Sequence, residues 1–231
     1  MNSLRPIKIK RNAIAYPEGS CLFESGMTKV LCAVSVSDQL PDHAKESDKG
    51  WITAEYAMLP CSGNRRTSRS RTLSSGRTKE IQRLIGRAMR SVVDLKAIQG
   101  LNITVDCDVL QADGGTRTAS INGAFIALVD ALRKVERQGK ITVWPVRDYV
   151  GAISVGIING KVVLDLDYEN DSRAEVDMNI VMTGRGKYIE VQGTAEQNPY
   201  SRLELNRMLE VAGKGIHQII KMQKKVLGPL K

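Results

Sequence analysis

Residues 106–120 decide the fold of this chain, and they read DCDVLQADGGTRTAS. Apolar residues alternate from Leu101 to Val109, which predicts a strand with one buried face. Two glycines follow, and residues 121–132 then show the apolar spacing of a helix. A strand that turns into a helix at a glycine pair leaves free backbone N–H groups at the helix start. The stretch therefore predicts a strand-turn-helix unit whose turn can bind an anion.

Arg117, just after the glycine pair, adds a charged group to this turn. A guanidinium can hold a phosphate or a carboxylate through two parallel hydrogen bonds. The alternative is a tight turn in which the glycines supply positive φ angles and Arg117 is a surface charge. The residues of this stretch alone leave both interpretations open.

The totals bound the class of protein. A chain of 231 residues forms one large domain or two small ones, and its net charge of +9 favours a polyanionic partner. No apolar run has the length of a membrane span, and residues 1–11 lack a signal-peptide core, so we expect no membrane partner. Four scattered cysteines indicate reduced thiols in a cytoplasmic protein. With only two histidines, a Ser-His-Asp triad or a histidine-rich metal centre is not expected.

The remaining chain alternates strand and helix patterns. Apolar helical spacing predicts amphipathic helices over residues 77–95 and 205–220, and a capping box from Ser201 to Glu204 precedes the second. Strand patterns and a strong hairpin turn at Asn159-Gly160 account for the rest; the strands are expected at residues 7–9, 21–23, 30–36, 51–58, 150–158, 161–168, 178–182 and 188–191. Strands followed by a helix, twice over, predict an α+β fold built as one compact domain or as two fused halves.

Residues 61–76 form a basic segment, and no acid occurs between Glu55 and Glu80. Such a composition predicts a mobile arm. Arginines without local carboxylates suit the phosphate backbone of a nucleic acid, although a merely soluble loop is the alternative. The candidate nucleic-acid contacts are Arg65, Arg66, Arg69 and Arg71. Arg77 then opens a helix, where its charge opposes the helix dipole and suggests a compensating anion.

Residues 165–177 carry six carboxylates in an otherwise basic chain. Asp171 and Asp177 flank a short connection between predicted strands, so both can point into one cleft. Such oxygen ligands suit Mg²⁺, which also binds substrate phosphate and stabilises charge on a phosphoryl group. The alternative is a solvated acidic loop, which spacing alone leaves open for Asp171 and Asp177. It is the favoured interpretation for the individual residues Asp165, Asp167, Glu169 and Glu175.

Five blocks of sequence resemble the ribonuclease PH family of phosphate-dependent 3′ exoribonucleases. They keep the family's order and span most of the chain, at residues 50–56, 76–86, 106–120, 164–182 and 190–196. The resemblance implies an α+β fold in which two ribosomal-protein-like β-α-β units are fused in one compact subunit, with residues 1–231 as a single domain. It also implies a ring-shaped homohexamer, a trimer of dimers.

The resemblance assigns roles to individual residues. Arg77 resembles the family's first phosphate-binding arginine. Gly115, Thr116 and Arg117 resemble the family's second phosphate-binding element. Ser120 lies where a hydroxyl could assist phosphate binding. The implied reaction trims the 3′ ends of transfer RNA precursors and other RNA. Inorganic phosphate is the co-substrate, and nucleoside diphosphates are released.

Asp171 and Asp177 resemble the family's two catalytic carboxylates, and they would hold Mg²⁺ or help to move a proton. The basic segment resembles the element that grips transfer RNA, but the loop from Pro60 to Gly76 is slightly shorter than usual and its arginines are spaced differently. A non-catalytic RNA-binding ring subunit of a larger RNA-degrading assembly is the rival interpretation. Such a subunit could lose the carboxylates or the phosphate arginines, and this chain has all of them.

Overall fold

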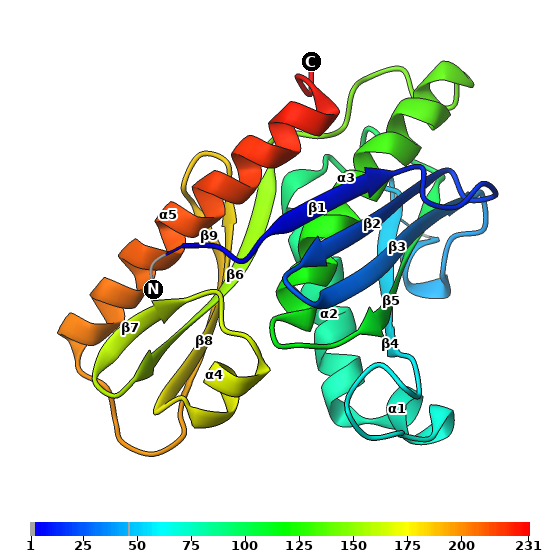
Figure 1. Cartoon of the computed structure of the whole chain (residues 1–231). Coiled ribbons are helices and arrows are strands. Elements are labelled where there is room, and N and C mark those ends of the chain that lie inside the picture. The colour runs from blue at the N-terminus through cyan, green and yellow to red at the C-terminus, as the bar shows by residue number, and fades with distance from the viewer. Residues whose placement is uncertain (1–2, 46) are drawn as a thin grey trace.

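The computed structural model describes residues 3–45 and 47–231 and shows two β-sheets with helices packed on them (Figure 1). The first sheet has the strand order β1-β2-β3-β5-β4. Its strands are β1 (Ile7–Arg11), β2 (Gly19–Ser25), β3 (Thr28–Ser37), β4 (Trp51–Met58) and β5 (Asn102–Gln111). Strand β4 runs parallel to β5, so helix α2 (Gly76–Val92) is the crossover of a β-α-β unit. The other neighbours are antiparallel.

The second sheet is antiparallel, with the order β7-β6-β8-β9. Its strands are β6 (Val150–Ile158), β7 (Lys161–Leu164), β8 (Val176–Thr183) and β9 (Tyr188–Ala195). Asn159 and Gly160 join β6 to β7 with φ angles of 49° and 68°. Positive φ at both central positions is what a two-residue hairpin turn of this twist requires, so the predicted hairpin is confirmed.

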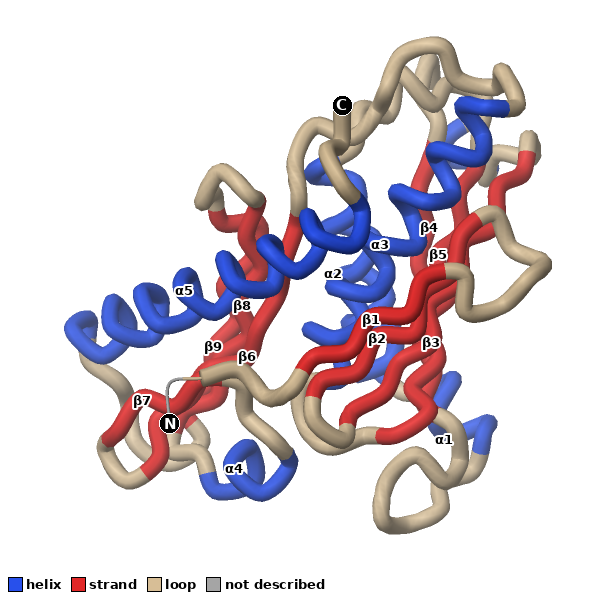
Figure 2. Tube along the Cα trace, turned by 45° about the horizontal axis from the view of Figure 1, so that its top comes forward, coloured by secondary structure: helices blue, strands red, loops and turns tan. Residues whose placement is uncertain are grey.

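Helix α3 (Thr116–Arg137) joins the two halves. It packs against β2 and β3 of the first sheet and against β6 of the second, and Figure 2 shows it lying beneath the first sheet. This sandwiched position explains why residues 119–132 are buried on nearly every face of the helix. Helix α5 (Arg202–Leu227) covers β6 and β7, and the predicted capping box between Ser201 and Glu204 is present.

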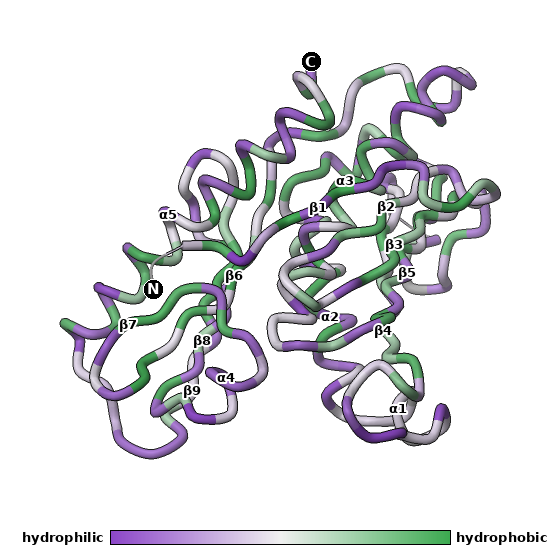
Figure 3. The backbone as a smooth tube through the Cα atoms, in the orientation of Figure 1, coloured by the Kyte–Doolittle hydropathy of each residue, from purple (hydrophilic) through white to green (hydrophobic). Residues whose placement is uncertain are grey.

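Two short α-helices in the described residues were not predicted. Helix α1 (Arg69–Ser74) forms inside the basic segment that we expected to be a mobile arm. Helix α4 (Tyr168–Arg173) forms inside the acidic cluster, where the side chain of Asp167 caps it by accepting from the N–H of Asn170 at 2.8 Å. Both are largely hydrophilic in Figure 3 and lie along the lower edge of the molecule. Six residues are too few for a periodic apolar pattern to reveal a helix.

Two further observations concern the cysteines and the apolar length of the helices. The four cysteines are free thiols, three of them buried and Cys61 exposed. Across residues 3–45 and 47–231, no helix combines the length and the hydropathy needed to cross a bilayer.

Candidate active site

The glycine turn between β5 and α3 forms as predicted. Gly114 and Gly115 have φ angles of 71° and 63°, in the left-handed region that favours glycine. A Cβ atom on Gly114 would lie 2.5 Å from the carbonyl oxygen of Leu166. The hydroxyl of Thr28 donates to the carbonyl of Gly114 at 2.7 Å and fixes the turn from β3. The phosphate-binding candidate of the first half therefore lies directly against the chain that leads into α4.

The start of α3 has the free donors of an anion site. Gly115 is the N-cap residue, and no side chain caps the helix there. The hydroxyl of Thr116 lies 2.9 Å from the hydroxyl of Tyr56. This hydrogen bond holds the Thr116 side chain at the N-terminus of α3. Ser120 is placed differently, because it is fully buried and its hydroxyl donates to the carbonyl of Thr116 at 2.8 Å. Because this hydroxyl is buried and already hydrogen-bonded, the structure does not favour the expected role of Ser120 in phosphate binding.

Arg77 and Arg117 come from different helices and act on the same carboxyl groups. The charges of both lower the pKa of Asp171 and of Asp177, against the stronger effect of burial. Arg77 is exposed at the start of α2, and it forms no ion pair with any residue that the structure describes. The structure thus places both arginines within electrostatic range of the same two carboxyl groups in a single subunit.

Arg117 has partners that the sequence did not reveal. Its side chain is only 14% exposed, and its Nη1 donates to Oε1 of Gln192 on β9 at 2.6 Å. The same nitrogen lies 3.6 Å from Oε1 of Glu80 on α2, and the amide of Gln192 donates to that oxygen. The amphipathic pattern of α2 did not show that Glu80 would take these partners. Gln192 lies within the block 190–196 that carries the family resemblance, and this was the only available signal.

The two carboxylates are held by different elements. Asp171 is on α4, in the connection between β7 and β8. Asp177 is the second residue of β8 itself. Burial raises the pKa of Asp171. Burial, followed by the charge of Asp171, raises the pKa of Asp177 to about 6. Two carboxyl groups that repel each other in a partly desolvated place suggest a site for a cation.

The donor set fits magnesium. Oδ1 of Asp177 is buried and has no hydrogen-bond partner in the described protein, so it is open to a cation. The described residues contain no cluster of three or more His, Cys, Asp or Glu side chains that could hold a metal. An ion here would rest on Asp171 and Asp177 alone, which suits Mg²⁺ because it keeps several waters and binds substrate phosphate.

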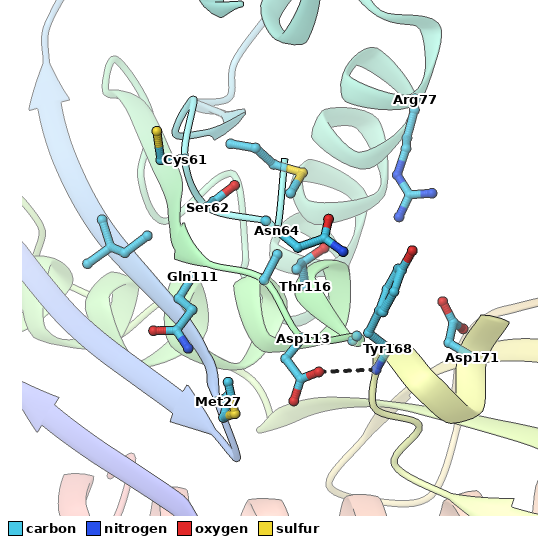
Figure 4. A pocket seen from close by; sticks show the side chains of 16 residues that line it. Met27, Cys61, Ser62, Asn64, Arg77, Gln111, Asp113, Thr116, Tyr168 and Asp171 are labelled. Carbon is cyan, nitrogen blue, oxygen red and sulfur yellow. Dashed lines mark hydrogen bonds between the residues drawn. The ribbon is translucent and has the colours of Figure 1, made fainter. Parts of the chain in front are cut away.

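A cavity of about 690 Å³ opens beside these groups. Arg77, Thr116 and Asp171 line it, and Figure 4 shows that they come from three different helices. The backbone of Gly114 and Gly115 also lines it. The cavity is large enough for a nucleotide-sized ligand beside the anion-binding turn.

The basic segment lies on the surface near this cavity. Arg65, Arg66 and Arg69 are exposed, as the sequence predicted. Arg69 is close enough to Asp108 on β5 to lower the pKa of that carboxyl, although burial is the larger effect and raises it. Arg71 lies in α1, and its side chain is outside the described part of the structure.

The acidic cluster is less solvated than we expected. The prediction that Asp165 is solvated is wrong. Its side chain is 2% exposed and forms an ion pair with Arg5 at 2.7 Å. Asp167 caps α4, whereas Glu169 is exposed and forms a surface ion pair with Arg173. The burial of Asp165 follows from a tertiary contact with the distant N-terminal segment, which no local pattern shows.

A turn with free N–H groups, two arginines that act on one carboxylate pair and an adjacent cavity suit a protein that acts on phosphate esters. The sequence model of the 3′ exoribonuclease family, domain 1, matches residues 3–134, and that of domain 2 matches residues 148–215. The chain belongs to the 3′ exoribonuclease family.

Full-length relatives agree with this assignment. Ribonuclease PH of Syntrophomonas wolfei is 52% identical over 229 residues, which cover 98% of this chain and 96% of the relative. Ribonuclease PH of Bacillus cereus is 52% identical over 230 residues, with 98% and 94% covered. A solved Archaeoglobus fulgidus exosome with RNA bound to the active site has a similar fold, with a TM-score of 0.83 at 22% identity over 96% of this chain and 89% of that one. The predicted family and fold class are confirmed.

Proposed function

We propose that this chain is a phosphate-dependent 3′-to-5′ exoribonuclease that trims the 3′ ends of transfer RNA precursors and other RNA. The observation that carries the proposal is that the charges of Arg77 and Arg117 act on both Asp171 and Asp177. Arg77 and Asp171 also line one cavity together with the glycine turn. The full-length relatives named ribonuclease PH support the same reaction. Inorganic phosphate is the co-substrate, and a nucleoside diphosphate is the product.

Phosphate binding is the first task of the site. Phosphate sits at the start of α3, where free N–H groups after Gly115 point at it, and Arg77 and Arg117 neutralise its charge. Inorganic phosphate and the RNA backbone are both anionic, so bringing them together is opposed by repulsion. Positioning and charge neutralisation therefore supply most of the rate.

The bond change is a transfer of one nucleotidyl group. A phosphate oxygen attacks the phosphorus of the last phosphodiester, the bond from that phosphorus to the 3′ oxygen breaks, and the shortened RNA keeps that oxygen. The 3′ oxygen takes up a proton, and the terminal nucleotide leaves as a nucleoside 5′-diphosphate. Because a phosphoanhydride replaces a diester, the reaction is readily reversible.

Asp171 and Asp177 serve the leaving side of this reaction. They would hold Mg²⁺, which when bound stabilises the charge that develops on the phosphoryl group. The raised pKa of Asp177, about 6, also suits a carboxyl that holds or gives up a proton near neutral pH.

RNA binding, assembly and location extend the proposal. The exposed Arg65, Arg66 and Arg69 contact the phosphate backbone of the transfer RNA. We propose a cytoplasmic homohexamer, a trimer of dimers. Tyr188 and Val191 on the edge strand β9 are 50% and 43% exposed, and a neighbouring copy could cover them. In solution, the expected mass is about six times the 25.4 kDa of one chain.

The decisive experiment uses the purified chain with 3′-extended transfer RNA. Nucleoside diphosphates should appear only when phosphate is added, and adding excess nucleoside diphosphate should lengthen the RNA again. Release of nucleoside monophosphates without phosphate would refute the proposal. A mass of one or two chains, with activity only after another protein is added, would favour the rival role as a subunit of a larger assembly.

A further inference from the structure

Tyr168 presents an aromatic ring to the cavity. It is the first residue of α4, it lines the cavity, and the residue is 59% exposed. Among the described residues its hydroxyl forms no hydrogen bond. Figure 4 shows the ring rising from the start of α4 toward the side of the cavity where Arg77 lies. A ring left open beside anion-binding groups can accept the flat part of a ligand.

The backbone below this ring is fixed. The N–H of Tyr168 faces Oδ1 of Asp113 at 3.4 Å, and the side chain of Asp167 caps the same helical turn. Gly114 packs so closely on this segment that an added Cβ would lie 2.5 Å from the carbonyl carbon of Asp167. A tyrosine on a fixed backbone has only two side-chain torsions to order, so it binds a ligand at a low entropic cost.

The ring is also placed correctly for the reacting nucleotide. Tyr168 and Asp171 are three residues apart on α4, so they lie on the same face of the helix, and both line the cavity. Asp171 belongs to the group that serves the scissile bond. The base of the nucleotide being released lies one ribose away from that bond, on the scale of one helical turn.

We propose that the ring of Tyr168 stacks on the base of the 3′-terminal nucleotide and holds it for attack. The inference rests on the proposed function and names the part of the RNA that this site recognises. Every base has a π-face, so stacking tolerates any terminal base. A trimming enzyme that reads its substrate in this way removes successive nucleotides without regard to sequence.

The test compares three variants on matched RNA oligonucleotides at saturating phosphate. Tyr168→Ala should lower kcat/KM for RNA by about 5- to 150-fold, the effect of losing one base–aromatic stack. Tyr168→Phe keeps the ring and should stay within about twofold of the unchanged protein. Tyr16→Ala removes an exposed ring from the segment before β2, outside the residues that line the cavity, and should also leave the rate unchanged. The KM for phosphate should not change in Tyr168→Ala.

An oligonucleotide with an abasic 3′-terminal nucleotide gives the sharpest comparison, with shortening of the labelled RNA as the readout. The unchanged protein should slow on it to the level of Tyr168→Ala, and Tyr168→Ala should slow no further. If Tyr168→Ala loses the same factor on abasic and ordinary RNA, or if Tyr168→Phe is as slow as Tyr168→Ala, the stacking inference is overturned.

Failure of the inference is separable from failure of the proposed function. The unchanged protein must first shorten ordinary RNA in the presence of phosphate, and only the proposed function depends on that result. Binding of the two oligonucleotides without phosphate, followed by fluorescence anisotropy, supplies a second readout: the unchanged protein should prefer the ordinary RNA, and Tyr168→Ala should not. Equal preference in both proteins would also overturn the inference.

Discussion

Arg5 donates hydrogen bonds to the carboxylate of Asp165 from both its backbone and its side chain. The N–H of Arg5 donates to Oδ2 at 2.9 Å, and Nη2 donates to Oδ1 at 2.7 Å. Nη1 of Arg5 also donates to the carbonyl of Asp113 at 2.6 Å. One guanidinium therefore holds the glycine turn of the first half against the segment that leads into α4 of the second half. Its charge also acts on Asp171.

Arg5→Ala should reduce both stability and turnover. Removing one partner of a buried ion pair costs about 3–5 kcal/mol, because Asp165 keeps an uncompensated charge. The phosphate turn and Asp171 should then lose their fixed relation, so kcat at saturating RNA should fall at least 10-fold. Thermal unfolding and phosphorolysis at several phosphate concentrations measure the two effects.

Arg11→Ala is the matched control for that variant. Arg11 forms a similar pair with Asp130, whose side chain is 7% exposed, through Nε at 2.8 Å and Nη2 at 2.5 Å. Asp130 lies about 21 Å along α3 from Thr116. Arg11→Ala should lose stability but keep its kcat well below its unfolding temperature. Equal losses of kcat in both variants would show that Arg5 contributes stability alone.

Gly114→Ala should be far more harmful than an ordinary change at a positive φ angle. A left-handed alanine costs about 1 kcal/mol, and at Gly114 the new Cβ would also lie 2.5 Å from the backbone of Leu166. Gly186→Ala is the control, because φ is 79° there and a Cβ would meet nothing within 4 Å. We expect Gly186→Ala to lose about 1 kcal/mol and to stay active. Similar unfolding temperatures and phosphate KM values for the two variants would contradict the close approach seen at Gly114.

Glu80→Gln should improve phosphate binding. Glu80 is 43% exposed and lies 3.6 Å from Arg117, so its charge competes with phosphate for the guanidinium. A partly exposed pair is worth about 0.2–1 kcal/mol, so the KM for phosphate should fall by about 1.5- to 5-fold. Arg117→Ala should raise it at least 10-fold. Glu169→Gln, which removes an exposed carboxylate, is the control. A higher KM in Glu80→Gln would mean that Glu80 instead holds Arg117 in its productive position.

Asp177 should make folding stability depend on pH. Its pKa of about 6 in the folded protein lies above the ordinary value near 4, so the folded state holds this proton more tightly. Stability from this group is therefore lost as pH rises from about 4 through about 6. Asp177→Asn removes that loss and should unfold at a higher temperature above pH 6, while having no turnover.

Thermal unfolding at a series of pH values, without phosphate or magnesium, checks this. The advantage of Asp177→Asn should vanish below about pH 4, where the wild-type carboxyl is protonated in both states. Asp38→Asn, at a carboxylate that is 71% exposed, is the control. A carboxyl NMR resonance of Asp177 that titrates near pH 4 would contradict the prediction.

Local chemistry made much of this protein predictable. The glycine pair, the hairpin at Asn159 and the capping box at Ser201 each depend on residues within a few positions of one another, so their conformations could be read directly. Periodic apolar residues likewise placed the long helices and most strands. The short helices α1 and α4 escaped, because one or two turns carry no period and the cap of α4 comes from a residue within the acidic cluster.

The sequence by itself determined the parts of the site: a turn with free N–H groups, two arginines and two carboxylates. Only the tertiary structure decided how they are arranged. It buried Asp165 against Arg5, gave Arg117 the partners Glu80 and Gln192, and turned Tyr168 toward the cavity. These relations join segments that are distant in sequence, and their free energies arise from desolvation and charge, which exist only once the two halves have packed together.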